Sequence, residues 1–148
     1  MLPESLDGTV NSAPAVPPSR CSILVVEDEA NIRSLLVEVL RKNGYDVLEA
    51  ANGRDAISLA CSQVLPIGLL ITDLGLPGMN GKEVIRQMVS SRPELRVLCL
   101  SAATPDSSLG IPPHNFLPKP FTLTGLIKKV KQTLGEPTET DLRNRKVG

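Results

Sequence analysis

The stretch SILVVE, residues 22–27, decides the fold: it is a short apolar run, rich in β-branched residues, that ends in an acid. Such a run favours a strand over a helix, and its apolar character on both faces is typical of a central strand in a parallel sheet. From residue 29 to residue 43 the apolar residues recur with the period of a helix: Ile32, Leu35, Leu36, Val39 and Leu40. The core therefore begins with a strand and a helix that ends before Gly44.

The same alternation of short apolar runs and amphipathic stretches continues toward the C-terminus. Further strands are expected at residues 45–50, 67–72, 96–100 and 115–118. Further helices are expected at residues 53–63, 81–91 and 123–134, with Thr122 starting the last one. Right-handed crossovers between such units close as an open sheet with helices on both faces. The sequence therefore predicts an α/β, flavodoxin-like (βα)5 fold, a doubly wound parallel sheet with strand order 2-1-3-4-5.

The segment TPDSSLGIPPH, residues 104–114, departs from this pattern. It contains three prolines and a glycine and has almost no apolar period, so a normal helix cannot form there. We expect a loop or at most one short turn. The fourth helix of the fold is thus predicted to be shortened or missing.

Composition divides the chain into three parts. Residues 1–20 are rich in proline, serine and small polar residues, which predicts a flexible leader or linker. Residues 21–135 have the length of one ordinary domain, and residues 136–148 read as a polar tail. No window approaches the roughly 18 apolar residues that span a bilayer. We therefore expect no membrane partner and a cytoplasmic location.

The charge and aromatic content exclude some functions. Lys plus Arg and Asp plus Glu number 16 each, so the chain lacks the basic footprint of a DNA-binding domain. Aromatic residues make up 2% of the chain, which leaves few surfaces on which bases could stack. Nucleic acid is therefore not an expected partner. Cys61 and Cys99 lie in apolar patterns and are expected to be buried and reduced, whereas Cys21 is the candidate for an exposed thiol.

Acidic residues follow two of the predicted strands. Glu27 and Asp28 come after the first strand and Asp73 after the third, and ligands of this fold bind between the carboxyl ends of these two strands. Three carboxylates gathered there would repel one another unless a cation lay between them. Oxygen donors without thiolate or imidazole favour a hard ion and suit Mg²⁺. The acids Glu29 and Glu49, by contrast, are interpreted as solvated.

Two further polar residues end strands at the same edge. Ser101 ends the fourth strand and Lys119 ends the fifth, which adds a hydroxyl and an ammonium to the predicted crevice. A carboxylate nucleophile beside Mg²⁺, with a lysine to neutralise charge and a hydroxyl to hold a phosphoryl oxygen, is suited to forming an aspartyl phosphate. Phosphoryl transfer asks the protein mainly for positioning and charge compensation.

Four motifs occur in order along the chain: VVEDE at 25–29, TDLGLPGMNG at 72–81, LSA at 100–102 and FLPKPF at 116–121. On these motifs the chain from Cys21 to about Leu134 resembles the receiver domain of two-component response regulators. The four together are highly specific, although each alone would be weak. Residues 109–122 are also similar to receivers at the C-terminus of hybrid sensor histidine kinases, so a stand-alone receiver and a piece of such a kinase both stay open.

The resemblance implies a role for each acid. Asp73 is expected to be the phosphoacceptor, and Asp28, Asp73 and the backbone carbonyl of Gly75 are expected to bind Mg²⁺. Glu27 matches an acid that helps to hold the metal through water. Lys119 bridges the phosphate and the acids.

The resemblance also implies a conformational switch. Ser101 is expected to move toward the new phosphate, and Phe116 matches the switch aromatic that turns inward behind it. The Lys119–Pro120 bond is expected to be cis, which an X-Pro bond adopts at a cost of only about 0.5 to 1 kcal/mol.

The implied function is a phosphoacceptor signalling module that catalyses only its own phosphorylation and dephosphorylation. A sensor histidine kinase or a histidine phosphotransfer protein would supply the phosphoryl group, and an unknown downstream protein would receive the signal through contacts. An Mg²⁺-dependent phosphohydrolase that uses Asp73 is the alternative, but it would want an acid where Gly75 lies. A flavodoxin-like FMN binder would want a phosphate-cradling loop after the first strand and stacking aromatics, and the sequence has neither.

Overall fold

The computed structural model describes residues 22–62, 66–75, 78, 81–101 and 115–136. In this part of the chain five parallel strands form one sheet in the order β2-β1-β3-β4-β5, which confirms the predicted topology. The strands are β1 (Ser22–Val26), β2 (Asp46–Ala50), β3 (Ile67–Asp73), β4 (Arg96–Ser101) and β5 (Phe116–Pro118). The helices are α2 (Ala30–Lys42), α3 (Gly53–Ser62), α4 (Gly81–Ser91) and α5 (Leu123–Leu134).

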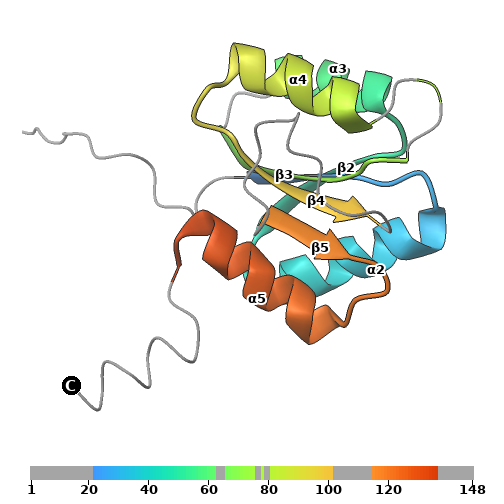
Figure 1. The fold of residues 1–148 in the computed structure, drawn as a ribbon, viewed down its shortest axis with the longest axis vertical. Coiled ribbons are helices and arrows are strands. Elements are labelled where there is room, and N and C mark those ends of the chain that lie inside the picture. The colour runs from blue at the N-terminus through green and yellow to red at the C-terminus, as the bar shows by residue number, and fades with distance from the viewer. Residues whose placement is uncertain (1–21, 63–65, 76–77, 79–80, 102–114, 137–148) are drawn as a thin grey trace, which may run out of the picture.

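The helices form a layer on each side of the sheet. Helices α3 and α4 cover one face, and α2 and α5 cover the other (Figure 1). Every residue of β1 is buried, and its side chains alternate between the two layers. Ile23 and Val25 belong to the core with α2 and α5, whereas Leu24 and Val26 belong to the core with α3 and α4. The two-sided burial predicted from SILVVE is therefore confirmed.

The helix ends follow the local sequence signals. The Thr122 hydroxyl accepts a hydrogen bond from the Gly125 N–H at 2.9 Å and caps the start of α5. Helix α2 is followed by Gly44 at a φ of 91°, in the left-handed region that favours glycine. The Lys119–Pro120 bond is cis, as expected.

Two predictions of burial are wrong. Leu35 was expected on the inner stripe of α2, yet it is 47% exposed, and Val37 is buried in its place. Helix α2 packs on β1 and β2 and also meets α5, so its buried face is turned toward Val37 and away from Leu35. Cys61 is likewise exposed, because the buried face of α3 runs through Ala56 and Ala60; Cys99 is buried as expected.

Four other predictions concern residues that the structure does not describe. The leader at residues 1–20, the exposed thiol of Cys21, the loop at 104–114 and the tail beyond Glu136 all lie outside the described residues. None of the helices in the described part of the chain combines the length and the apolar character that a bilayer crossing needs.

Helix α4 begins in close contact with the end of β3. The Gly81 N–H donates to the Leu74 carbonyl at 3.2 Å. A Cβ at position 81 would overlap the carbonyl oxygen of Asp73 and would lie 2.7 Å from the Leu74 Cα. Glycine is therefore required at this position because two backbone segments approach too closely for a side chain.

We predict that Gly81→Ala lowers the free energy of unfolding by about 1 to 3 kcal/mol, the usual effect of overpacking. The added methyl must push the start of α4 away from the end of β3. Urea denaturation measures the change. The matched control is Ser90→Ala at an exposed position of the same helix, which should alter stability by no more than about 0.5 kcal/mol. Equal stability of the two variants would contradict the close approach.

Candidate functional site

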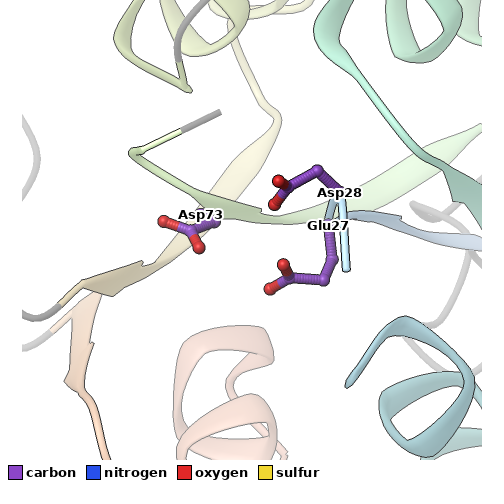
Figure 2. A group of neighbouring side chains, drawn as sticks. All are labelled: Glu27, Asp28 and Asp73. Atoms are coloured by element: carbon purple, nitrogen blue, oxygen red, sulfur yellow. The ribbon is translucent and has the colours of Figure 1, made fainter. Parts of the chain in front are cut away.

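Three carboxylates meet at the carboxyl edge of the sheet, as the sequence predicts. Strands β1 and β3 are neighbours in parallel register, with Val26 opposite Thr72, so the residues that follow them emerge side by side. One oxygen from each of Glu27, Asp28 and Asp73 lies within 4.8 Å of the others. Figure 2 shows the carboxylates of Glu27 and Asp28 directed to the side on which Asp73 lies.

Lys119 adds an ammonium to this cluster from the end of β5. Its Nζ lies 2.5 Å from Asp73 Oδ2 and 3.8 Å from Glu27 Oε1. Burial acts to lower the pKa of Lys119, but the Asp73 hydrogen bond and the three carboxylate charges outweigh it, so this pKa is raised above its ordinary value. The lysine is therefore held charged as the counter-ion of the acids.

Glu27 is a buried carboxylate that is only partly satisfied. It is 1% exposed, and its Oε2 accepts a hydrogen bond from the Glu29 N–H at 3.2 Å. Its Oε1 is buried and has no hydrogen-bond partner. Burial raises the pKa of Glu27, and the charge of Asp73 acts in the same direction, against the Glu29 N–H and Lys119. A buried carboxylate oxygen left in this state indicates a position for a cation.

The donor set fits a hard divalent cation. Three carboxylates against the single ammonium of Lys119 leave two negative charges in the cluster, which one divalent cation would neutralise. The donors are oxygens, without thiolate or imidazole, and hard ions prefer such ligands. The cluster therefore meets the chemical requirements of a magnesium site on grounds that are independent of any resemblance.

The loop after β3 begins by folding back onto Asp73. The Gly75 N–H donates to Asp73 Oδ1 at 2.8 Å, so both oxygens of Asp73 have a partner, one from the backbone and one from Lys119. Gly75 therefore lies beside the predicted acceptor. This position is compatible with the role that the resemblance implies for its carbonyl, which is to bind the same metal as Asp73.

Ser101 and Phe116 lie on β4 and β5. Ser101 is the last residue of β4 and is buried, and its carbonyl accepts the Lys119 N–H at 3.0 Å. Phe116 is buried in the core under α3 and α4. The predicted switch residues thus occupy adjacent strands: Ser101 ends β4 at the edge that carries the acids, and Phe116 begins β5 opposite Cys99.

Sequence reasoning missed a contact beside the acids. Glu49 is exposed, which agrees with its interpretation as solvated, but it also forms an ion pair with Arg33 at 3.2 Å, and Arg33 donates to the Glu27 carbonyl at 2.8 Å. No sequence motif marked Arg33, because the contact depends on how α2 docks against the ends of β1 and β2.

A doubly wound parallel sheet with an acidic pocket and a lysine at its carboxyl edge defines a class of phosphoacceptor signalling domains. A family model described as the response regulator receiver domain matches residues 23–131. The chain therefore belongs to the response regulator receiver domain family. The acidic triad is typical of the magnesium site of receivers, and a receiver domain implies a histidine kinase as its partner.

Similar proteins include whole regulators and a kinase. Response regulator MprA of Mycolicibacterium vanbaalenii is 34% identical over 123 residues, which covers 80% of this chain and 52% of MprA. Sensor kinase CckA of Brucella abortus is 31% identical over 117 residues, which covers 76% of this chain and 12% of CckA. The chain thus spans about half the length of the first of these relatives and a small part of the second.

One solved structure bears on the acidic pocket. Response regulator protein TrrA of Thermotoga maritima, solved in complex with Mg²⁺-BeF, is 32% identical to this chain with a TM-score of 0.67. The match covers 76% of this chain and 98% of TrrA.

We predict that Asp28→Asn raises the free energy of unfolding by about 0.5 kcal/mol when divalent cations are removed with EDTA. The substitution removes one of three neighbouring negative charges while it keeps the size of the side chain. The control is Asp46→Asn, an exposed carboxylate at the opposite end of the sheet, which should leave stability unchanged. Thermal denaturation of both variants measures the change. A loss of stability in Asp28→Asn would show that the three carboxylates do not repel one another.

Proposed function

We propose that the domain accepts a phosphoryl group on Asp73 in an Mg²⁺-dependent reaction. The observation that carries this proposal is the approach of Glu27, Asp28 and Asp73 to within 4.8 Å of one another, with Lys119 at 2.5 Å from Asp73. Three acids this close together do not stabilise the folded state, because like charges repel. They suit a site where a cation and a transferred phosphoryl group are to be bound.

The chemical step is an exchange of one bond to phosphorus for another. An oxygen of Asp73 attacks the phosphorus of a phosphohistidine, a new P–O bond forms, and the P–N bond breaks as the imidazole leaves. Lys119 then stabilises the negative charge on the phosphoryl oxygens, since its ammonium already contacts the attacking carboxylate. The step needs no oxidant or reductant.

Mg²⁺ would be held by Asp28, Asp73 and the carbonyl of Gly75, with Glu27 acting through water. When bound, the metal supplies charge neutralisation for the acceptor and for the phosphoryl oxygens. Two observations support this assignment: Glu27 Oε1 is buried with no hydrogen-bond partner, although Lys119 lies 3.8 Å away, and two negative charges of the cluster are uncompensated. The TrrA structure, solved with Mg²⁺-BeF, supports it by likeness.

The proposed signal starts at Ser101. Its hydroxyl would turn toward the phosphoryl group on Asp73, and Phe116 would repack in response. Strand β4, which ends in Ser101, pairs with the strand that carries Asp73, and β5, which begins with Phe116, pairs with β4, and this arrangement supports the coupling. The phosphohydrolase alternative is weaker, because position 75 is a glycine and offers no acidic side chain to protonate a leaving group.

We assign residues 21–135 to the receiver, preceded by a linker at 1–20 and followed by a tail at 136–148. The phosphoryl donor would be a sensor histidine kinase or a histidine phosphotransfer protein, and the output would pass through contacts with a downstream protein. The free thiol buried at Cys99 is compatible with the reducing cytoplasm. Likeness to both MprA and CckA is compatible with a separate regulator and with a part of a hybrid kinase.

Asp73→Asn should abolish phosphorylation by acetyl phosphate with Mg²⁺, because the amide is not a nucleophile. Intact-protein mass spectrometry should find one added phosphoryl group in the wild type and none in the variant. Asp46→Asn, far from the pocket, should be labelled as the wild type is. Labelling that persists in Asp73→Asn would refute the assignment of the acceptor.

Lys119→Met should spare Mg²⁺ binding but slow phosphorylation by about 100-fold, the effect of removing one group that stabilises developing negative charge. Calorimetry with Mg²⁺ and the rate of labelling by acetyl phosphate separate the two effects. Lys128→Met, an exposed lysine of α5, is the control and should change neither. An undiminished rate in Lys119→Met would remove this lysine from the reaction.

A further inference from the structure

The segment that joins β1 to α2 carries two of the acids and has few local restraints. Asp28, Glu29 and Ala30 are all exposed. Glu29 occupies the N-cap of α2, but its side chain makes no capping hydrogen bond. The usual device that fixes the entry of a chain into a helix is thus absent here. The Glu29 N–H donates to Glu27 Oε2 at 3.2 Å and so orients the Glu27 carboxylate, but the carbonyl of the Glu27–Asp28 peptide is held by a further contact.

Arg33, in the first turn of α2, supplies that contact. Its Nη1 donates to the carbonyl oxygen of Glu27 at 2.8 Å, and its Nε donates to Glu49 Oε1 at 3.2 Å. The Arg33 side chain is only 19% exposed. One guanidinium therefore ties together the end of β1, the first turn of α2 and the edge strand β2.

The held carbonyl belongs to the peptide bond between Glu27 and Asp28. Because a peptide unit is planar, fixing its oxygen also fixes the direction in which the Asp28 Cα leaves the strand. We propose that Arg33 is a positioning residue: it holds the Glu27–Asp28 peptide so that both carboxylates face the cation beside Asp73. This inference rests on the proposed function, since the cation is the group for which the acids are oriented.

The described ion pair of Arg33 is formed with Glu49, outside the cluster of Glu27, Asp28 and Asp73. Its ion pair with Glu49 neutralises the guanidinium, whereas Lys119 contacts the acids directly. Arg33 therefore acts through geometry. A lysine in its place would keep the positive charge but has no planar fork with which to reach the carbonyl and the carboxylate together.

The test compares Arg33→Met and Arg33→Lys with a matched control. Arg41→Met is suitable, because Arg41 also lies on α2 and donates to a backbone carbonyl, that of Val47, at 3.1 Å. Neither Arg41 nor Val47 is one of the clustered acids or a sequence neighbour of one. Calorimetry with Mg²⁺ alone should find binding about tenfold weaker in both Arg33 variants, a typical loss when a residue that orients metal ligands is removed. Arg41→Met should bind Mg²⁺ within twofold of the wild type.

Two further measurements separate positioning from general damage. Without Mg²⁺, amide exchange at Asp28 and Glu29 should be faster in Arg33→Met while exchange in β3 is unchanged. With acetyl phosphate, the Mg²⁺ concentration for half-maximal rate should rise about tenfold, but the rate at saturating Mg²⁺ should stay within threefold. Glu49→Gln, which keeps the contact with the Glu27 carbonyl, should show the same changes to a smaller degree.

Distinct results overturn the inference and the proposed function. Mg²⁺ affinity within twofold of the wild type in Arg33→Met or in Arg33→Lys would overturn the positioning role, as would an equal loss in Arg41→Met. If the wild type itself binds no Mg²⁺, the proposed function fails. In that case amide exchange at Asp28 and Glu29 still tests whether Arg33 restrains the Glu27–Asp28 peptide. Equal exchange in Arg33→Met and the wild type would overturn this restraint.

Discussion

Burial of a negative charge at the end of a central strand is the constraint on which the site depends. Because β1 and β3 run in parallel register, Glu27 and Asp73 must emerge beside each other, and Glu27 is 1% exposed. Burial raises the pKa of Glu27, and Asp73 acts in the same direction. Lys119 compensates only part of this charge. A cation site is therefore a direct consequence of where the two strands end.

The apolar core keeps the charges in this unfavourable arrangement. Strand β1 and most of β3 are buried on both faces, between the α2 and α5 layer and the α3 and α4 layer (Figure 1). A strand packed on both faces cannot shift its end without opening one of the two cores. Gly81 adds a backbone contact between the end of β3 and α4. The repulsion among the acids is thus opposed by packing that is spread over the whole sheet.

The sequence predicts the sheet and the acids because both depend on local patterns. A run such as SILVVE identifies a strand, and the acid that follows it must lie at the carboxyl edge. What the sequence does not predict depends on how elements dock. Leu35 fits the helical period of α2 and is still exposed, because the position of α5 and of β2 decides which side of α2 is buried.

Long-range polar contacts escape sequence reasoning for the same reason. The Tyr45 hydroxyl donates to Glu136 Oε1 at 2.8 Å across 91 positions of sequence, and Arg33 meets Glu49 across 16. Of the four partners, the three charged residues taken alone have the character of solvated surface residues, and Tyr45 has that of a core residue. Only the packing of α2 and α5 against the sheet brings these groups together. Polar contacts between residues far apart in sequence therefore need the structure before a role can be assigned to either partner.

The short edge strand explains where a signal from the pocket would travel. Strand β5 has three residues and pairs with β4 at three positions, whereas β1 and β3 are enclosed by neighbours on both sides. Ser101 and Lys119 are joined through the backbone at the end of this ladder, and Phe116 lies at its start. A change in charge at Asp73 acts on Lys119 directly, since their side chains are in contact. In the proposed switch, the short edge strand β5 therefore carries the aromatic ring, and Lys119, the residue that follows this strand, contacts the acceptor.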